Sequence, residues 1–258
     1  MTLTISILDA LGNEKATATG QEISKIVYYD GYDDGDVIQL TTDKVPGFYE
    51  IKIDETIEKA QVYMKEKQWS YKIDFSKRGK SLHPLAFENQ VHFLYFRILE
   101  NPTTSMLNPL DQENNQGMYP HVSSNAQTRG EPAFACTNVI DGIYANTRHA
   151  KWPYTSWGIG GRKDAKLKVD FGRMVDIQKI TFYLRAQFPH DSYWQEGKLS
   201  FNGQDEIILK FRKTDEAQIF EFDDKKASYI EFYDLIKAND ESPFPSLSLI
   251  EVIANELN

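Results

Sequence analysis

The sequence predicts an all-β fold made of two consecutive β-sandwiches of the jelly-roll type. The first observation is strict alternation, as at the start of the chain, where Leu3, Ile5 and Ile7 share one face; this is the period of a half-buried strand. The second is that turn signals such as Asp30 to Gly35 separate the apolar runs. The third is that no segment of the first half sustains the apolar stripe of a helix.

Residues 1–110 contain seven short apolar runs. Their number and spacing favour an antiparallel sandwich or jelly roll as the N-terminal domain. The runs cover residues 2–7, 25–29, 36–40, 48–53, 60–64, 69–73 and 91–98.

The composition then changes to polar, turn-rich sequence with Asn-Pro pairs and few β-branched residues. This change predicts a linker over residues 111–130. The second domain, residues 131–258, returns to alternation, with Leu167, Val169 and Phe171 on one face before Gly172 ends the run. Its further strands are expected at 177–185, 207–211, 219–222, 229–233 and 247–253.

Charge and cysteine content restrict the partners. The net charge is -9, and both halves are acidic: residues 1–110 carry 12 Lys+Arg against 16 Asp+Glu, and residues 131–258 carry 16 against 20. We therefore expect no nucleic-acid partner. The single cysteine, Cys136, excludes an intrachain disulfide and predicts a buried structural thiol.

No apolar run is long enough to span a membrane, and the N-terminus has no basic, apolar leader. We expect a cytoplasmic protein, or a secreted one if a signal peptide has been removed. The acidic cluster Asp30, Asp33, Asp34 and Asp36 lacks the spacing of an EF-hand loop, so it is interpreted as a solvated turn.

An ordered set of short motifs in the second half carries a family resemblance. They are Asn138-Val-Ile-Asp-Gly142, an Asn-Thr pair followed by Trp, Leu167-Lys-Val-Asp-Phe-Gly172, Ile177-Gln-Lys-Ile-Thr-Phe182 and Ile250-Glu-Val252. Residues 119–256 resemble the discoidin, or coagulation-factor C-type, family, which includes the family 32 carbohydrate-binding modules with the galactose-binding-like fold. The resemblance implies an eight-stranded jelly roll with a ligand site in the loops at one end.

The resemblance also implies a structural calcium beneath those loops. Calcium takes six to eight oxygen ligands, and the matching positions offer them. The expected ligands are Asn138, Asp141, Asn146, Thr147 and Glu251. The loop after Gly142 is longer than the family pattern, which puts the Asn-Thr pair in doubt. The alternative is that Asp141 only caps its Asp-Gly turn.

The ligand residues are predicted from the stereochemistry of sugars. Aromatic rings stack on apolar C–H faces, and charged donors bind hydroxyl groups. Two loops, 148–157 and 185–194, combine Arg and His with Trp and Tyr, and a third, 237–245, is expected at the rim. The predicted set is His149, Trp152, Trp157, Arg185, His190, Asp191 and Trp194. Alternatively, Trp152 or Trp157 plugs the end of the sandwich, and Arg185 pairs with Asp191.

These features predict a non-catalytic carbohydrate-binding protein of undetermined oligomeric state. The sequence has no nucleophile elbow, zinc motif or phosphate loop. Paired carboxylates can come together from distant positions, so a glycoside hydrolase or a polysaccharide lyase-related enzyme remains an alternative. A protein-interaction module is a third.

Overall fold

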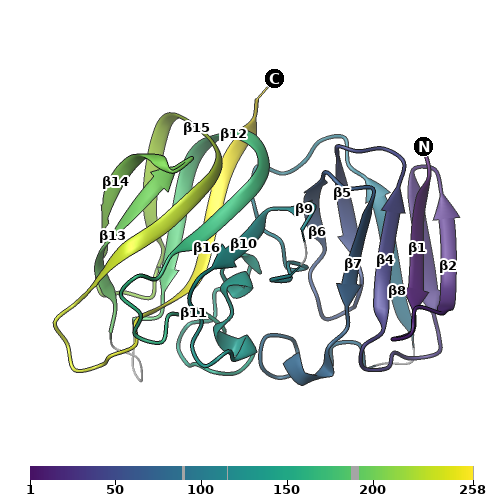
Figure 1. Cartoon of the computed structure of the whole chain (residues 1–258), viewed down its shortest axis with the longest axis horizontal. Helices are drawn as coiled ribbons and strands as arrows, with labels where there is room; N and C mark the ends of the chain where they lie inside the picture. The colour runs from purple at the N-terminus through teal and green to yellow at the C-terminus, as the bar shows by residue number, and fades with distance from the viewer. Residues whose placement is uncertain (89–90, 115, 187–191, 258) are drawn as a thin grey trace.

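The computed structural model describes residues 1–88, 91–114, 116–186 and 192–257 (Figure 1). The prediction of an all-β fold is confirmed, because every ladder between two named strands is antiparallel. The described helices are three short 3₁₀ turns, η1 (Phe75–Lys77), η2 (Pro132–Phe134) and η3 (Cys136–Ile140). None of the helices in these ranges has the length and apolarity needed to cross a membrane.

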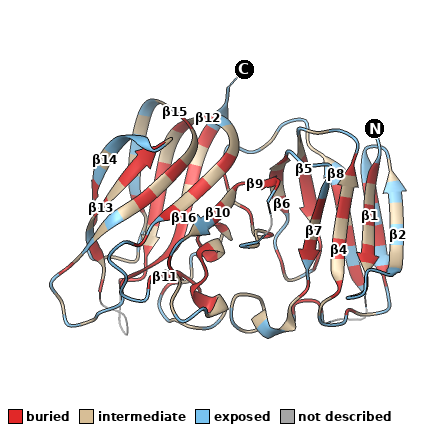
Figure 2. Cartoon of the chain, in the orientation of Figure 1, coloured by how far each residue is buried: buried red, intermediate tan, exposed pale blue. Residues whose placement is uncertain are grey.

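The N-terminal part forms two sheets that enclose one core. The four-stranded sheet has the order β2-β1-β4-β7, and the five-stranded sheet has the order β3-β8-β5-β6-β9. Figure 2 shows buried residues alternating with less buried ones along β1 and β4, as the sequence predicts. The strands are β1 (Leu3–Leu8), β2 (Glu14–Gly20), β3 (Ile23–Tyr28), β4 (Val37–Thr42), β5 (Gly47–Lys52), β6 (Ala60–Met64), β7 (Gln68–Lys72), β8 (His92–Ile98) and β9 (Met118–Tyr119).

The C-terminal part forms a seven-stranded sheet around a second core. Its order is β11-β16-β12-β15-β13-β14, and β10 also pairs with β12. The aromatic residues Phe171, Phe182 and Phe232 are fully buried in this core. The strands are β10 (His121–Ser124), β11 (Trp157–Gly158), β12 (Leu167–Leu184), β13 (Trp194–Phe201), β14 (Gln204–Lys210), β15 (Gln218–Lys237) and β16 (Ser246–Glu256).

Gly172 does not end its strand, contrary to the sequence prediction. β12 continues through it to Leu184, with a shift of register between Asp170 and Val175. Gly172 has φ +71°, and a Cβ atom there would lie 2.4 Å from the ring of Tyr119. The glycine therefore makes a bulge that lets the strand bend beneath an aromatic ring.

The segment around the predicted linker contributes to both cores. Met106 and Val122 lie in the C-terminal core, whereas Leu110 and Met118 lie in the N-terminal core. Within this segment β9 pairs with β6, and two residues later β10 begins to pair with β12. The chain therefore passes between the two groups of sheets while making strand contacts with each of them.

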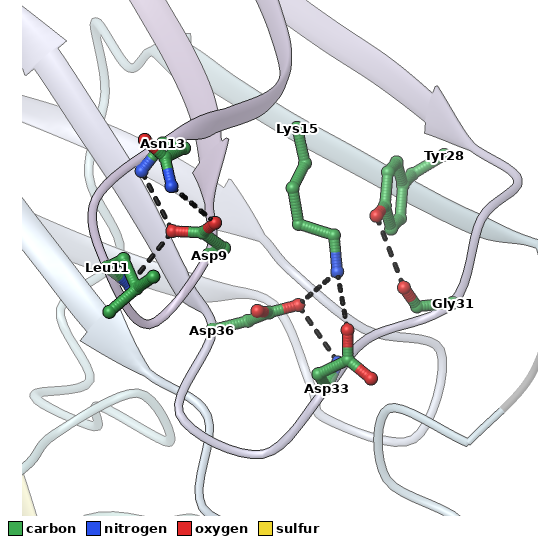
Figure 3. Close-up of polar contacts among 8 residues, drawn as sticks. All are labelled: Asp9, Leu11, Asn13, Lys15, Tyr28, Gly31, Asp33 and Asp36. Carbon is green, nitrogen blue, oxygen red and sulfur yellow. Dashed lines mark hydrogen bonds and ion pairs between the residues drawn. The ribbon is translucent and has the colours of Figure 1, made fainter.

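The acidic turn at residues 30–36 contains a buried ion pair, so it is only partly solvated. Asp36 is 1% exposed, and its Oδ2 accepts hydrogen bonds from Lys15 Nζ at 2.7 Å and from the Asp33 backbone N–H at 2.9 Å (Figure 3). Lys15 Nζ also lies 3.1 Å from Asp33 Oδ2. Lys15 is thus the cation that balances the carboxylates of Asp33 and Asp36.

Candidate functional site

Loops at one end of the seven-stranded sheet enclose a cavity of about 630 Å³, which we call the loop-end pocket. In Figure 1 this is the lower end of the sheet, near β11 and opposite the C-terminus. The pocket is lined by residues of the 125–131 loop, η2, the 141–156 loop, β11 and the segment after it, the residue that follows β12, and the segment that leads into β16. Its charged and aromatic lining residues are Arg129, Phe134, His149, Arg162, Arg185 and Phe244.

A close approach of two backbone segments builds one wall. The Thr128 backbone N–H donates to the Gly158 carbonyl at 2.7 Å, and the Gly160 N–H donates to Thr128 Oγ1 at 2.9 Å. A Cβ atom at position 158 would lie 2.7 Å from that same Oγ1. Glycine at this position therefore lets the loop that carries Arg129 pack against β11.

Arg185 is the buried charge of the pocket. It follows the last residue of β12, and its backbone N–H donates to the Ser246 carbonyl at 3.1 Å, which places it beside the first residue of β16. The residue is only 2% exposed, and its Nε and Nη1 have no hydrogen-bond partner among the described residues. Its guanidinium lies 5.8 Å from the Phe134 ring centroid. Burial lowers the pKa of Arg185 to about 10, so it remains charged at neutral pH.

His149 and Phe244 line the same pocket. Burial, followed by the positive charges of Arg185 and Arg129, lowers the pKa of His149. The imidazole is therefore mainly neutral at pH 7, and a neutral ring can both donate and accept a hydrogen bond. Phe244 is 51% exposed, so its ring has a free face for an apolar ligand surface.

The structure brings two of the predicted ligand residues, His149 and Arg185, into one pocket. Trp157 and Trp194 lie instead in the C-terminal core, at 0% and 1% exposure. Their burial leaves no ring face for a ligand, which corrects their place in the predicted set. Trp152 is half-buried and lies against His83, with ring centroids 4.4 Å apart, in a separate cavity of about 420 Å³.

His190 and Asp191 lie outside the described residues. Four of the charged and aromatic lining residues were absent from the predicted set: Arg129, Phe134, Arg162 and Phe244. The first falls in the predicted linker, and the second falls in an apolar run that indicates only core. Phe244 belongs to the third loop expected at the rim, where an aromatic residue between two prolines was an available signal.

The predicted calcium ligands form hydrogen bonds with different parts of the chain. Asn138 and Asp141 lie on or beside η3, where the Asp141 backbone N–H donates to the Asn138 carbonyl. The Asn146 side-chain amide donates to the carbonyls of Leu184 and Asp215. Thr147 is exposed, and Glu251 Oε1 accepts a hydrogen bond from Ser105 Oγ at 3.3 Å.

Asp141 is half-buried, and its Oδ1 accepts the Ile143 backbone N–H at 2.8 Å. Burial outweighs this bond and the contact with Thr155, and it raises the pKa of Asp141 to about 8. The Oδ1 contact is the turn cap that was the alternative interpretation, and Asp141 forms no ion pair with a described residue.

A different group of described residues has ligand atoms close enough for a metal. The ligand atoms of Asp54, Glu55 and His92 lie within 4.8 Å of one another in the N-terminal part. Hydrogen bonds and ion pairs account for this arrangement: His92 Nδ1 lies 3.4 Å from Asp54 Oδ2 and 3.3 Å from Glu55 Oε2. Asp54 also accepts backbone N–H bonds from Thr56 and Phe87.

Comparison with protein families finds no matching family model, and comparison with curated proteins finds no match. Among solved structures, a family 32 carbohydrate-binding module of C. perfringens NanJ in complex with galactose is 16% identical, covering 51% of this chain and 90% of that chain, with a TM-score of 0.39. The lectin domain of lectinolysin complexed with Lewis B antigen is 16% identical over 54% and 94%, with a TM-score of 0.43. A Streptococcus pneumoniae fucose binding module is 14% identical over 57% and 95%, with a TM-score of 0.41. About half of this chain is thus similar to carbohydrate-binding modules and lectin domains.

Proposed function

We propose that this chain is a non-catalytic carbohydrate-binding protein that binds glycans in the loop-end pocket. The observation that carries the proposal is that Arg185 and Phe244 line the same pocket: Arg185 is buried, with no hydrogen-bond partner for Nε and Nη1 among the described residues, and Phe244 is exposed. A sugar offers hydroxyl oxygens to such a donor and an apolar C–H face to such a ring. His149 adds a neutral imidazole that can exchange hydrogen bonds with further hydroxyl groups.

The size of the pocket supports this proposal. A volume of about 630 Å³ falls within the range of small-ligand sites. Backbone contacts between Thr128, Gly158 and Gly160 hold one wall in place before any ligand binds. A preformed wall reduces the entropy that binding would otherwise cost.

We also propose the division into a domain at 1–110, a linker at 111–130 and a discoidin-like domain at 131–258, with calcium bound in the last of these. The donor set fits calcium best at Asp141, a half-buried carboxylate that has no cationic partner among the described residues. The Asn138 carbonyl is close in the chain and would be a further oxygen ligand. Bound calcium would supply the positive charge that this carboxylate lacks.

A glycan array on the intact chain tests the proposed function. The ligands retained are then titrated by calorimetry against wild type, Phe244→Ala and His149→Ala. Both side chains line the pocket, so we expect each substitution to weaken binding about tenfold or more, the effect of losing one good contact. Phe93→Ala, at an exposed phenylalanine of β8, is the matched control and should leave binding unchanged.

Thermal unfolding of the same variants separates loss of binding from loss of fold. Equal binding by wild type and Phe244→Ala would place the site elsewhere. Retention of no glycan by the wild-type chain would reject the function. Turnover of a retained oligosaccharide would indicate the enzymatic alternative.

A further inference from the structure

The loop-end pocket has an unusual charge balance for this acidic chain. Among the described residues that line it, three are arginines, one is a histidine and none is acidic. The chain as a whole has a net charge of -9. A concentration of positive charge at one cavity therefore opposes the average charge of the protein.

Two of the three arginines have partners. Arg129 Nε lies 2.6 Å from Glu131 Oε1, and Arg162 Nη2 lies 2.6 Å from Asp164 Oδ2. These pairs are exposed to solvent, which screens them further. Among the described residues, the charge of the pocket that has no ion-pair partner is therefore that of Arg185.

Arg185 has little water around it to solvate its charge. The residue is 2% exposed, and in the described structure no carboxylate forms an ion pair with it. An isolated buried charge is costly, and a guanidinium cannot escape the cost by losing its proton at neutral pH. Its contact with the Phe134 ring balances only part of the charge. The rest of the balancing negative charge then has to come from what occupies the pocket.

We propose that the glycan bound here is acidic, with Arg185 as the counter-ion of an anionic group on the sugar. The inference rests on the proposed function, because it names the class of glycan for the same site. The shared chemistry is a carboxylate or sulfate group, and planar guanidinium groups bind both through charge-assisted hydrogen bonds. Phe244 and His149 then contact the rest of the sugar.

The test compares matched neutral and acidic ligands on the full chain. Calorimetric titrations use oligogalactose against oligogalacturonic acid, and a neutral galactoside against its sulfated form. We expect the acidic member of at least one pair to bind about tenfold or more tightly, the effect of one charge-assisted bond. This preference should shrink as the salt concentration rises. The two pairs distinguish a carboxylate from a sulfate as the anionic group.

Variants at Arg185 test whether that residue carries the preference. Arg185→Gln should make acidic and neutral members bind equally, while Arg185→Lys, which keeps the charge, should retain a preference. Arg212→Gln, at an exposed arginine outside the pocket, is the control and should behave as wild type. If Arg185→Gln does not fold, the wild-type ratio and its salt dependence decide alone.

Equal or tighter binding of the neutral members would overturn the proposal and leave the proposed function standing. Unchanged preference in a folded Arg185→Gln would also overturn it. Failure of all four saccharides to bind would also overturn the proposal, and the glycan array then decides the proposed function by itself.

Discussion

The indole rings of Trp157 and Trp194 lie 5.9 Å apart at an interplanar angle of 43° in the C-terminal core. Trp157 Nε1 donates to the Ala126 carbonyl at 2.8 Å, which satisfies its only polar atom. Trp194 also makes an edge contact with Phe232. The pair thus joins β11 to β13 through packing, at the end of the sheet where the loop-end pocket lies.

Trp194→Ala should destabilise the protein strongly. Removing a fully buried tryptophan leaves a large cavity, and such changes cost about 3–5 kcal/mol. Denaturant unfolding followed by circular dichroism measures the change. Trp152→Ala is the comparison, and because this residue is half-buried its cost should be clearly smaller. A loss below about 1 kcal/mol for Trp194→Ala would contradict the core assignment.

The two tryptophans show what the sequence could not determine. Trp157 comes at the end of an irregular segment and Trp194 at the start of a strand, so no alternation reveals which side each ring faces. The sequence also could not determine that Arg185 is buried. Alternation along β12 predicts an outward side chain, but Arg185 is 2% exposed and its guanidinium lies 5.8 Å from the Phe134 ring centroid.

Strands with apolar alternation were the most predictable elements. The seven runs of the first half correspond to β1 and to β3 through β8. β2 was missed because its sequence, Glu-Lys-Ala-Thr-Ala-Thr-Gly, contains no large apolar residue. It is an edge strand in the sheet order, where pairing with β1 rather than side-chain burial holds it.

Lys15→Met should destabilise the N-terminal part by about 3 kcal/mol, because it leaves the buried Asp36 carboxylate without its cation. The Asp33 N–H would be the remaining donor to Asp36 Oδ2 shown in Figure 3. Urea unfolding measures the loss. Lys25→Met, at an exposed lysine of β3, is the control and should change stability by less than about 0.5 kcal/mol. Equal behaviour of the two variants would refute a stabilising role for the Lys15–Asp36 pair.

Protonation of Glu50 should lower the free energy of unfolding in acid. Burial alone would raise its pKa, but hydrogen bonds from Lys59, Tyr95, Gln61 and Arg97 outweigh burial and lower the pKa to about 2. The usual value is 4.5, so the unfolded chain takes up the proton first as the pH falls. The stabilisation is present above pH 4.5 and is lost between about 4.5 and 2.

Free energies of unfolding at several pH values between 7 and 2.5 test this for wild type and Glu50→Gln. The variant cannot titrate at this position, so its stability should fall less steeply over that range. Parallel curves would show that other carboxylates cause the acid loss.

The contribution of Asp141 to stability should have the opposite pH dependence, and it should change when calcium binds. Its pKa is raised by burial from 3.8 to about 8, so the folded state holds the proton more tightly than the unfolded state. The stability due to the protonated form is complete below pH 3.8 and is lost as the pH rises towards 8. Calcium bound to the carboxylate would displace that proton and restore stability at high pH.

Melting temperatures with calcium or with a chelator, at pH 5 and pH 8, test both statements. Calcium should raise the melting temperature more at pH 8 than at pH 5, because a smaller fraction of the Asp141 carboxyl is protonated at pH 8 and has to lose its proton. Asp141→Asn cannot ionise, so it should lose both the calcium effect and the decline of stability between pH 5 and pH 8. A wild-type melting temperature that responds to neither calcium nor chelator would reject the ion, and Asp141 would then serve only to cap the turn at Ile143.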